Sequence, residues 1–402
     1  MRRIFLLLVS LGLMLAPARQ VQAQASVQLT DVGVSYTFGE KIIFSATIQT
    51  KSSIQTAYLL FQVEGDTNTH TIPLEVVSGG KTEYTYLIRD GLLRPFSRLF
   101  YWYHLALTDS DPYDSSRYSF QYDDNRYPWQ TIQDSSLSLH WVAGEISFGQ
   151  AAFDAAHAGY LAIQALIPVK PGSPINIYIY ASAADVQNTL NLGGYTWVGG
   201  HASPDLGVVL VSIAPGETQA IEMERQIPHE LAHILLYRLT GSTYANQPTW
   251  LLEGIASQAE RYPNANYAQV LAIASQKKTL LPITSLCGPF PADASGATLA
   301  YAESDSFTRY LHETYGTSGL QTLIQAYSDG LTCEQGTERA FGLPLTQLDQ
   351  AWRQVSLGEK TTGIAFQNFL PYLLLLAIVI VIPVWQLLGV QKKVVYDRRK
   401  PQ

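Results

Sequence analysis

The sequence predicts an α+β protein with an N-terminal β-sandwich, a second domain in which a mixed sheet precedes a mainly helical part, and one C-terminal transmembrane helix. Three patterns lead to this fold class. Short runs of alternating apolar and polar residues fill the chain up to about residue 124, helical patterns dominate after about residue 226, and one long apolar run lies near the C-terminus. With 402 residues, the chain has room for two folded domains.

We expect the β-sandwich to span residues 26–124. Turn-forming residues such as Ser78-Gly79-Gly80 and Thr108-Asp109-Ser110-Asp111 separate the alternating runs. About seven short strands within about 100 residues are typical of an immunoglobulin- or fibronectin-like sandwich. The clearest strands are expected at residues 41–48, 57–63, 82–88, 99–107 and 118–122.

The second domain is expected at residues 125–358. Its central helix should begin near Gln226 or Ile227, so that Pro228 falls in the first turn, where its missing N–H costs nothing, and should end at Gly241. The other elements are predicted as strands near residues 138–142, 175–180 and 207–211, and as helices near residues 151–166, 249–262, 267–276, 297–315, 320–328 and 345–355.

Both ends of the chain carry targeting patterns. Residues 1–25 are predicted to be a secretory signal peptide, because Arg2 and Arg3 precede an apolar stretch that ends in small residues. Residues 369–388 are predicted to span a membrane, since about 20 apolar residues rise about 30 Å as a helix. The basic tail, residues 389–402, is then cytoplasmic, which places the ectodomain outside the cytoplasm. A buried C-terminal core helix is the alternative interpretation of the apolar run.

The charge distribution argues against nucleic acid as a partner. The whole chain has a formal net charge of −7, but eight of its 26 Lys and Arg residues lie in the two terminal segments, which hold only one of its 33 acidic residues. The ectodomain therefore has 18 basic and 32 acidic residues and a net charge of about −14. Binding to nucleic acid depends on basic residues that neutralise phosphates, so we expect no nucleic-acid partner.

The chain has two cysteines, Cys287 and Cys333, and both lie in the second domain. Outside the cytoplasm such a pair is expected to form a disulfide, which would stabilise the fold by about 2–4 kcal/mol. Two unpaired, buried thiols are the alternative. We expect no role for either cysteine in metal binding.

A metal-binding pattern lies at the start of the helical part. His229 and His233 are four residues apart, so on a helix they lie on one face about one turn apart. Glu253, on an apolar helical run, can supply the third ligand of a zinc site that leaves one position for water. Glu230, beside the first histidine, is the candidate general base for metal-assisted hydrolysis. The alternative is a solvated helix face.

At these positions the chain resembles the gluzincin metallopeptidases, the group that includes thermolysin and binds Zn²⁺ through His, His and Glu. It is more narrowly similar to the peptidase-MA-like domains of bacterial surface proteins. The matching segments are Pro-His-Glu-Leu-Ala-His at residues 228–233, Pro-Thr-Trp-Leu-Leu-Glu-Gly-Ile-Ala at residues 248–256, and Tyr-Ala-Glu-Ser at residues 301–304. The resemblance covers about residues 127–355 and implies a gluzincin-type zinc peptidase domain.

The resemblance also implies where a peptide substrate binds. In gluzincins, the last strand before the metal-binding helix is an edge strand that pairs with an extended peptide, a general mode of peptide recognition. Val208, Val209 and Leu210 occupy this position, and they are therefore the predicted substrate-binding residues. An ordinary internal sheet strand is the alternative.

Two further roles are assigned to candidate residues. Tyr301 is the leading candidate for stabilising the oxyanion of the reaction, with Tyr237 and His201 as alternatives. A metal-bound histidine usually has a hydrogen-bonding partner that orients it. Ser257 is the predicted partner, and Glu260 is the alternative, because both share the helical stripe of Glu253.

The resulting functional hypothesis is a membrane-anchored, extracytoplasmic, zinc-dependent peptidase that acts on a peptide or protein substrate. The β-sandwich could bind a partner in the cell envelope, position substrate or serve as a spacer. The alternative hypothesis is a surface binding or sensory protein that uses an inactive or weakly active peptidase scaffold. The presence of the candidate base Glu230 favours the enzyme.

Overall fold

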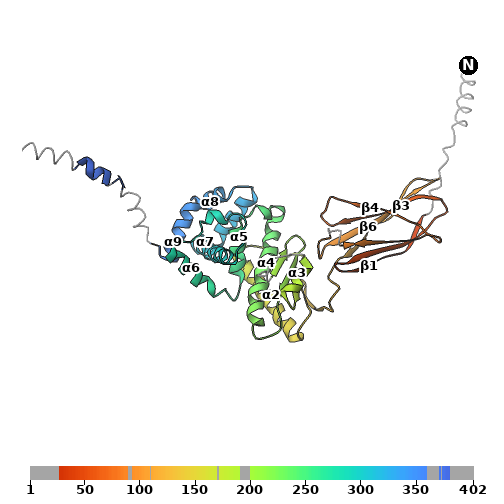
Figure 1. Ribbon diagram of the computed structural model, residues 1–402, viewed down its shortest axis with the longest axis horizontal. Coiled ribbons are helices and arrows are strands. Elements are labelled where there is room, and N and C mark those ends of the chain that lie inside the picture. Colours follow the sequence, from red (N-terminus) through yellow and green to blue (C-terminus); the bar gives the residue numbers. More distant parts are fainter. Residues whose placement is uncertain are drawn as a thin grey trace, which may run out of the picture. The chain divides into compact units, whose positions relative to one another are not determined.

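A computed structural model gives the structure of the chain (Figure 1) and describes residues 27–88, 93–108, 110–169, 172–190, 200–359, 371–372 and 374–380. The chain forms two compact units. The first contains residues 1–130 and 180–196, and the second contains residues 131–179 and 197–402. The predicted signal peptide, residues 1–25, lies outside the described residues.

The first unit contains the predicted β-sandwich. All strand pairs in its two sheets are antiparallel. One sheet has the order β1-β2-β5, and the other has the order β4-β3-β6-β7, with β8 also paired to β6. The strands are β1 (Gln28–Thr37), β2 (Lys41–Gln49), β3 (Ile54–Val63), β4 (His70–Leu74), β5 (Lys81–Leu87), β6 (Arg98–Leu107), β7 (Tyr113–Asp114) and β8 (Tyr118–Gln121); a short helix, α3 (Ala183–Leu190), also belongs to this unit.

Residues that alternate along the strands fill the space between the two sheets. Every second residue of β2 and of β6 is buried, as the alternating pattern predicts. Phe44 from one sheet contacts Phe61 and Tyr101 from the other, with ring centroids 5.7 and 5.2 Å apart. These contacts confirm that the two sheets pack face to face as a sandwich.

The second unit is built on a mixed five-stranded sheet with the order β12-β13-β11-β10-β9. The pair β10–β11 is parallel and the pair β12–β13 is antiparallel, in agreement with the predicted mixed sheet. Helix α2 packs against both α4 and the sheet. The elements are β9 (Gln130–Gln133), β10 (Leu137–Trp141), α2 (Ile146–Leu166), β11 (Ile175–Tyr180), β12 (Gly200–Ser203), β13 (Val208–Ser212) and α4 (Gln219–Thr240).

The rest of the second unit is helical. Helix α7 is kinked at Gly316, whose φ of 69° is non-helical, so the two helices predicted on either side of this residue are one interrupted element. Helix α8 was not predicted. The elements are the 3₁₀ helix η2 (Gly241–Asn246), α5 (Thr249–Ala259), α6 (Asn266–Lys277), the 3₁₀ helix η3 (Ile283–Leu286), α7 (Ala294–Ser328), α8 (Cys333–Phe341) and α9 (Leu345–Leu357).

The predicted disulfide is confirmed. Cys287 and Cys333 are bonded, with their Cα atoms 6.2 Å apart. The bond links two residues that are 46 positions apart in the sequence. A disulfide typically stabilises the folded state by about 2–4 kcal/mol. The carbonyl oxygen of Cys287 accepts a hydrogen bond from the N–H of Thr249, at the first residue of α5, so the disulfide lies beside the start of that helix.

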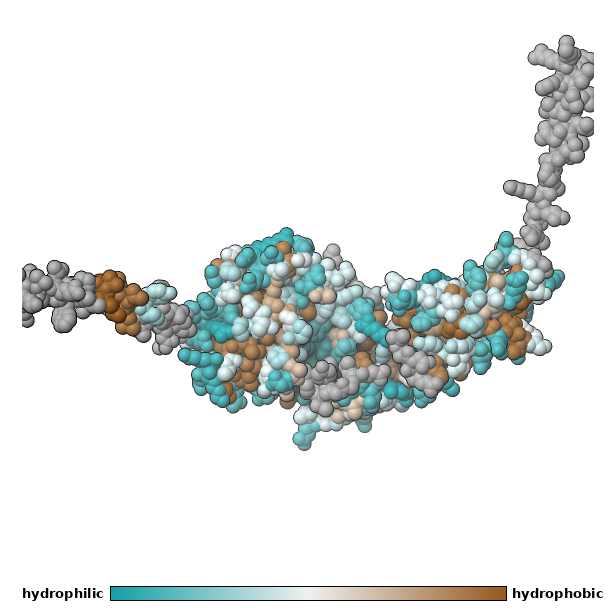
Figure 2. Space-filling view, turned by 45° about the horizontal axis from the view of Figure 1, so that its top comes forward, coloured by the Kyte–Doolittle hydropathy of each residue, from teal (hydrophilic) through white to brown (hydrophobic). Residues whose placement is uncertain are grey.

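Only part of the predicted membrane-spanning run is described. Residues 371–372 and 374–380 are helical, and Leu375, Ile378 and Ile380 are each more than half exposed. The described part of this run includes the brown stretch among grey atoms in Figure 2. Among the described residues, no helix has the length and apolar character needed to cross a membrane. The remainder of the predicted span 369–388 and the whole tail 389–402 lie outside the described residues, so the transmembrane helix stays a prediction.

Helix α7 carries a carboxyl group that is completely buried. The Oε1 atom of Glu303 accepts a hydrogen bond from the N–H of Leu281 at 2.9 Å, but its Oε2 atom has no hydrogen-bond partner. Burial raises the pKa of Glu303 to about 8, an effect that the Leu281 N–H and the charge of Arg353 oppose and that of Asp349 reinforces. Glu303 is therefore expected to be protonated in the folded protein at neutral pH.

This buried acid predicts a pH dependence of stability. An unfolded Glu has a pKa of about 4.3, so the folded state binds the Glu303 proton more tightly, and its contribution to stability is complete below about pH 4.3 and is lost as the pH rises through about 8. The variant Glu303→Gln cannot ionise. Its melting temperature should therefore rise relative to wild type between pH 5 and 9, as measured by circular dichroism. An identical pH profile for Glu303→Gln and the exposed-site control Glu313→Gln would contradict this assignment.

Candidate metal centre

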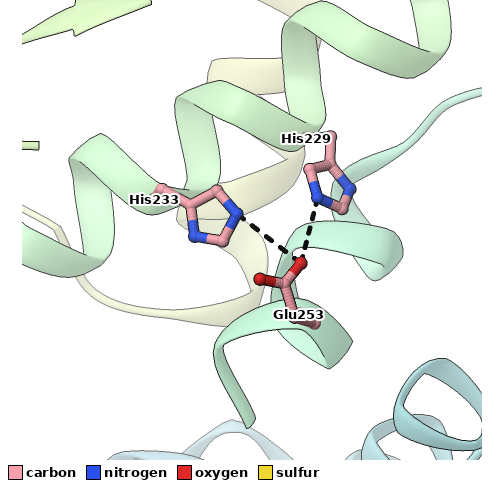
Figure 3. A group of neighbouring side chains, drawn as sticks. All are labelled: His229, His233 and Glu253. Atoms are coloured by element: carbon pink, nitrogen blue, oxygen red, sulfur yellow. Dashed lines mark ion pairs between the residues drawn. The ribbon is translucent and has the colours of Figure 1, made fainter. Parts of the chain in front are cut away.

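Two helices bring the predicted ligand residues together. Helix α4 carries His229 and His233 one turn apart, and α5 carries Glu253 opposite them (Figure 3). The Nε2 atom of His229 lies 3.3 Å from Oε2 of Glu253, and the Nε2 atom of His233 lies 3.8 Å from the same oxygen. All three atoms lie within 4.8 Å of one another.

This arrangement fits a small divalent cation. Ligand atoms bound tetrahedrally at about 2.0–2.1 Å lie about 3.3–3.4 Å apart, close to the two distances to Glu253. The Oε2 atom of Glu253 is buried and has no hydrogen-bond partner. A buried carboxylate oxygen without a partner is costly, and a cation bound between it and the two imidazoles would remove this cost.

A different oxygen atom faces the Nδ1 atom of each imidazole. Nδ1 of His229 lies 3.0 Å from Oε1 of Glu260, and Nδ1 of His233 lies 3.0 Å from the hydroxyl oxygen of Tyr244. An imidazole that donates its Nδ1–H to such an acceptor keeps the lone pair of Nε2 for a metal. Both Nε2 atoms are thus directed at the space beside Glu253.

The prediction of Ser257 as an orienting partner is wrong. Its hydroxyl group is buried and makes no hydrogen bond to either imidazole. Glu260, the alternative, takes this position because α5 ends at Ala259 and Glu260 has an extended conformation (φ −60°, ψ 123°), from which its longer side chain reaches His229. Tyr244, which no sequence pattern indicated, lies in the short helix η2 that follows α4.

Helix α4 begins at Gln219, seven residues earlier than predicted, so Pro228 lies inside the helix. Proline has no N–H to donate to the carbonyl four residues earlier, which belongs to Glu224. That carbonyl instead accepts a hydrogen bond from the N–H of Arg261 at 2.9 Å. Because Arg261 follows Glu260, the proline helps to hold the chain segment that supplies the partner of His229.

The three ionisable groups of this cluster, His229, His233 and Glu253, influence one another. Burial alone would lower the pKa of His229, but the nearby carboxylates of Glu253 and Glu260 raise it well above its usual value. Burial lowers the pKa of His233 to about 4. Burial also opposes ionisation of Glu253, yet the two nearby imidazoles lower its pKa. This pattern indicates a carboxylate that is stabilised by two histidines.

Glu230 has the properties of a group that exchanges protons. Burial raises its pKa to about 7, His229 opposes this shift, and the negative charges of Glu253 and Glu260 reinforce it. A carboxyl group that titrates near neutral pH can both accept and return a proton. Glu230 lines the same cavity as the three candidate ligands.

The three candidate ligands line one cavity of about 300 Å³. Tyr301 lines it, with its ring centroid 6.4 Å from that of His229. Burial, together with the charges of Glu253 and Glu230, raises the pKa of Tyr301, so its hydroxyl group stays protonated and can donate a hydrogen bond. The residues that line the cavity are Gly200, His201, Ala202, Pro204, His229, Glu230, His233, Tyr244, Glu253 and Tyr301.

The two alternatives to Tyr301 differ in position. His201 lines the cavity. Tyr237 is not among the cavity-lining residues, and its ring contacts that of Tyr244 at a centroid distance of 5.9 Å. The structure therefore brings Tyr301 and His201, but not Tyr237, to the candidate site.

The prediction that Val208, Val209 and Leu210 form an edge strand is wrong. Their strand, β13, lies between β12 and β11, and the three residues are 3%, 0% and 1% exposed. Strands β12 and β13 pair as an antiparallel hairpin, and β12 comes first in the strand order. Among the described residues, β12 is therefore the edge strand. No strand was predicted for Gly200–Ser203, because glycine weakens a strand pattern.

Comparisons with known proteins give a family match and several structural matches of low sequence identity. A search of curated protein sequences finds no match. Among solved structures, the chain is similar to an M1 zinc metallopeptidase from Deinococcus radiodurans (12% identity, TM-score 0.35, covering 82% of this chain and 93% of that chain). It is also similar to an aminopeptidase N family protein from Idiomarina loihiensis (10% identity, TM-score 0.28, covering 86% and 73%). A β-1,3-glucan-binding domain of carbohydrate-binding module family 56 also matches (12% identity, TM-score 0.17, covering 23% and 98%).

A family profile described as the peptidase MA superfamily matches residues 155–358. This segment is just over half of the 402-residue chain, and it contains the His229, His233 and Glu253 cluster together with every residue that lines the cavity. The chain therefore belongs to the peptidase MA superfamily.

Proposed function

We propose that the chain is a zinc-dependent peptidase that hydrolyses peptide bonds outside the cytoplasm. The observation that carries this proposal is the convergence of two Nε2 atoms and one carboxylate oxygen on a single point, beside a buried carboxyl group that titrates near neutral pH. Zinc is favoured because imidazole and carboxylate ligands in a three-residue set with one open position are typical of catalytic zinc sites.

His229, His233 and Glu253 would hold the zinc ion. When bound, zinc supplies Lewis-acid polarisation of the scissile carbonyl group and lowers the pKa of water. Glu230 then accepts a proton from the attacking water on its carboxylate and returns it to the leaving amine. Its pKa near 7 suits both transfers, since the proton is neither lost nor retained too strongly at neutral pH.

Tyr301 is proposed to stabilise the oxyanion that develops on the attacked carbonyl. Its hydroxyl group is protonated and borders the cavity that holds Glu230 and the ligand set. A hydrogen-bond donor fixed at this position stabilises negative charge more strongly than water does, because its orientation needs no rearrangement during the reaction.

Edge strand β12 is proposed to bind the substrate in place of β13. Gly200, His201 and Ala202 line the cavity, and the outer edge of an edge strand has backbone groups that can pair with an extended peptide. A peptide paired with β12 would lie beside Glu230.

Membrane anchoring is part of the proposal. It is supported by the apolar run at residues 369–388, by the basic residues that follow it, and by the exposed apolar side chains of its described part. The acidic ectodomain and the disulfide are both consistent with a position outside the cytoplasm. The β-sandwich is proposed as a docking module for a partner in the cell envelope.

The first prediction from the proposed function concerns the general base. Glu230→Gln keeps the size of the side chain but cannot accept a proton, so kcat for peptide hydrolysis should fall by about 10²- to 10⁴-fold. Zinc content, measured by elemental analysis, should stay at wild-type level because Glu230 is outside the ligand set. The exposed-site variant Glu217→Gln is the control. Retained activity in Glu230→Gln would rule out the assigned role.

The second prediction concerns Tyr301. Tyr301→Phe removes only the hydroxyl group, so kcat should fall by about 10²- to 10³-fold, the usual effect of losing one oxyanion donor, while KM changes little. Steady-state kinetics on one peptide substrate provide the measurement. An unchanged kcat would exclude Tyr301 and leave His201 as the remaining cavity-lining alternative.

The third prediction concerns zinc affinity. Tyr244→Phe removes the acceptor for Nδ1 of His233 while the aromatic ring remains, so the zinc dissociation constant should rise by about 10- to 100-fold. Competition with a chromophoric chelator measures this constant without any assay of hydrolysis. Tyr237→Phe is the matched control, because its ring contacts Tyr244 but does not line the site. Equal affinities of the two variants would show that Tyr244 does not orient the ligand.

A further inference from the structure

The carboxylate of Glu230 lies directly against the backbone of Gly200, the first residue of edge strand β12. A Cβ atom built on Gly200 would lie 2.6 Å from Oε1 of Glu230, 3.0 Å from its Cγ and 3.1 Å from its Cδ. All three atoms belong to one side chain, so the space that any other residue at position 200 would use is occupied by the candidate general base.

The strand register explains why the missing side chain points toward Glu230. Directly opposed residues in an antiparallel pair have their side chains on the same face of the sheet. Gly200 is opposite Val211, which is fully buried in the core that also contains residues of α4. Position 200 therefore faces α4, the helix that carries Glu230, and β12 packs against this helix.

The contact differs from glycine contacts that only allow close packing. At Gly159 a Cβ atom would meet Pro228, with its ring and backbone at 2.7–3.0 Å, and such rigid groups cannot move aside. At Gly200 it would meet the end of a flexible side chain, which can rotate away without disturbing the fold. Adding a methyl group here should displace the carboxylate and leave the protein folded.

We propose that Gly200 is a positioning residue for the peptidase reaction, because its lack of a side chain leaves the space in which β12 and α4 hold the carboxylate of Glu230. The inference rests on the proposed function, in which Glu230 is the general base. Ordinary van der Waals contact begins at about 3.4 Å, so relieving a 2.6 Å contact requires Oε1 to move by about 0.8 Å. A misplacement of about 1 Å can reduce a reaction rate about 100-fold.

The test compares Gly200→Ala with Gly216→Ala, a control at which a Cβ atom would meet open space. For Gly200→Ala we expect wild-type zinc content, a KM within about threefold of wild type and a kcat reduced about 100-fold. Gly216→Ala should match wild type in all three. A wild-type kcat for Gly200→Ala would overturn the inference.

A double-mutant cycle shows whether Gly200 acts through Glu230. Glu230→Asp shortens the side chain by one methylene group, so it frees space for a methyl group at position 200. Gly200→Ala should therefore lower kcat about 100-fold in the wild-type background but less than about threefold in the Glu230→Asp background. Equal effects in the two backgrounds would show that Gly200 acts on strand β12 or on the substrate, and would overturn the inference.

A crystal structure of metal-free Gly200→Ala provides a readout that needs no activity. The carboxylate of Glu230 should be displaced by about 0.8 Å or more, with His229, His233 and Glu253 unmoved. An unmoved carboxylate would overturn the inference. If wild type itself hydrolyses no peptide, the proposed function fails, whereas the crystal structure still decides whether Gly200 positions Glu230.

Discussion

The approach of α5 to α4 is the constraint on which the candidate site depends. Glu253 reaches both imidazoles because α5 packs against α4, and α5 also packs against α7. Gly254 permits the second approach, since a Cβ atom there would collide with the hydroxyl group of Thr308 and lie 2.6 Å from the carbonyl oxygen of Ser304. The Cys287–Cys333 disulfide beside the start of α5 adds a covalent restraint on the same helix.

Contacts made by residues outside the ligand set orient the ligand side chains. The carbonyl group freed by Pro228 binds the segment after α5, and this segment places Glu260 against His229. Tyr244 has the equivalent role for His233. The two ligand histidines thus have different kinds of partner, a carboxylate just after α5 and a phenol in η2. Strand β12, which also lines the cavity, confines Glu230. His229, His233 and Glu230 are all on α4, and each is held in place by a residue from another segment.

The sequence predicted the parts of the fold that depend on periodicity and the parts of the site that depend on short spacing. The i, i+4 spacing of His229 and His233 determines their common helix face, and the alternating pattern of β2 and β6 determines the sandwich core. Glu260 and Tyr244 could not be selected in the same way, because their positions depend on where α5 ends and how the chain turns after α4. Strand β12 was missed because its backbone pairing leaves no apolar pattern in Gly200-His201-Ala202-Ser203.

The metal content of the purified ectodomain, residues 26 to about 362, tests the central claim most directly. Elemental analysis of wild type should give about one zinc ion per chain, and the same measurement on His229→Ala or Glu253→Ala should give almost none, because each variant leaves only two of the three ligands. A wild-type ectodomain that binds no zinc from a solution with excess metal would contradict the account. Zinc that remains stoichiometric in both variants would contradict it equally, since the ion would then be bound elsewhere.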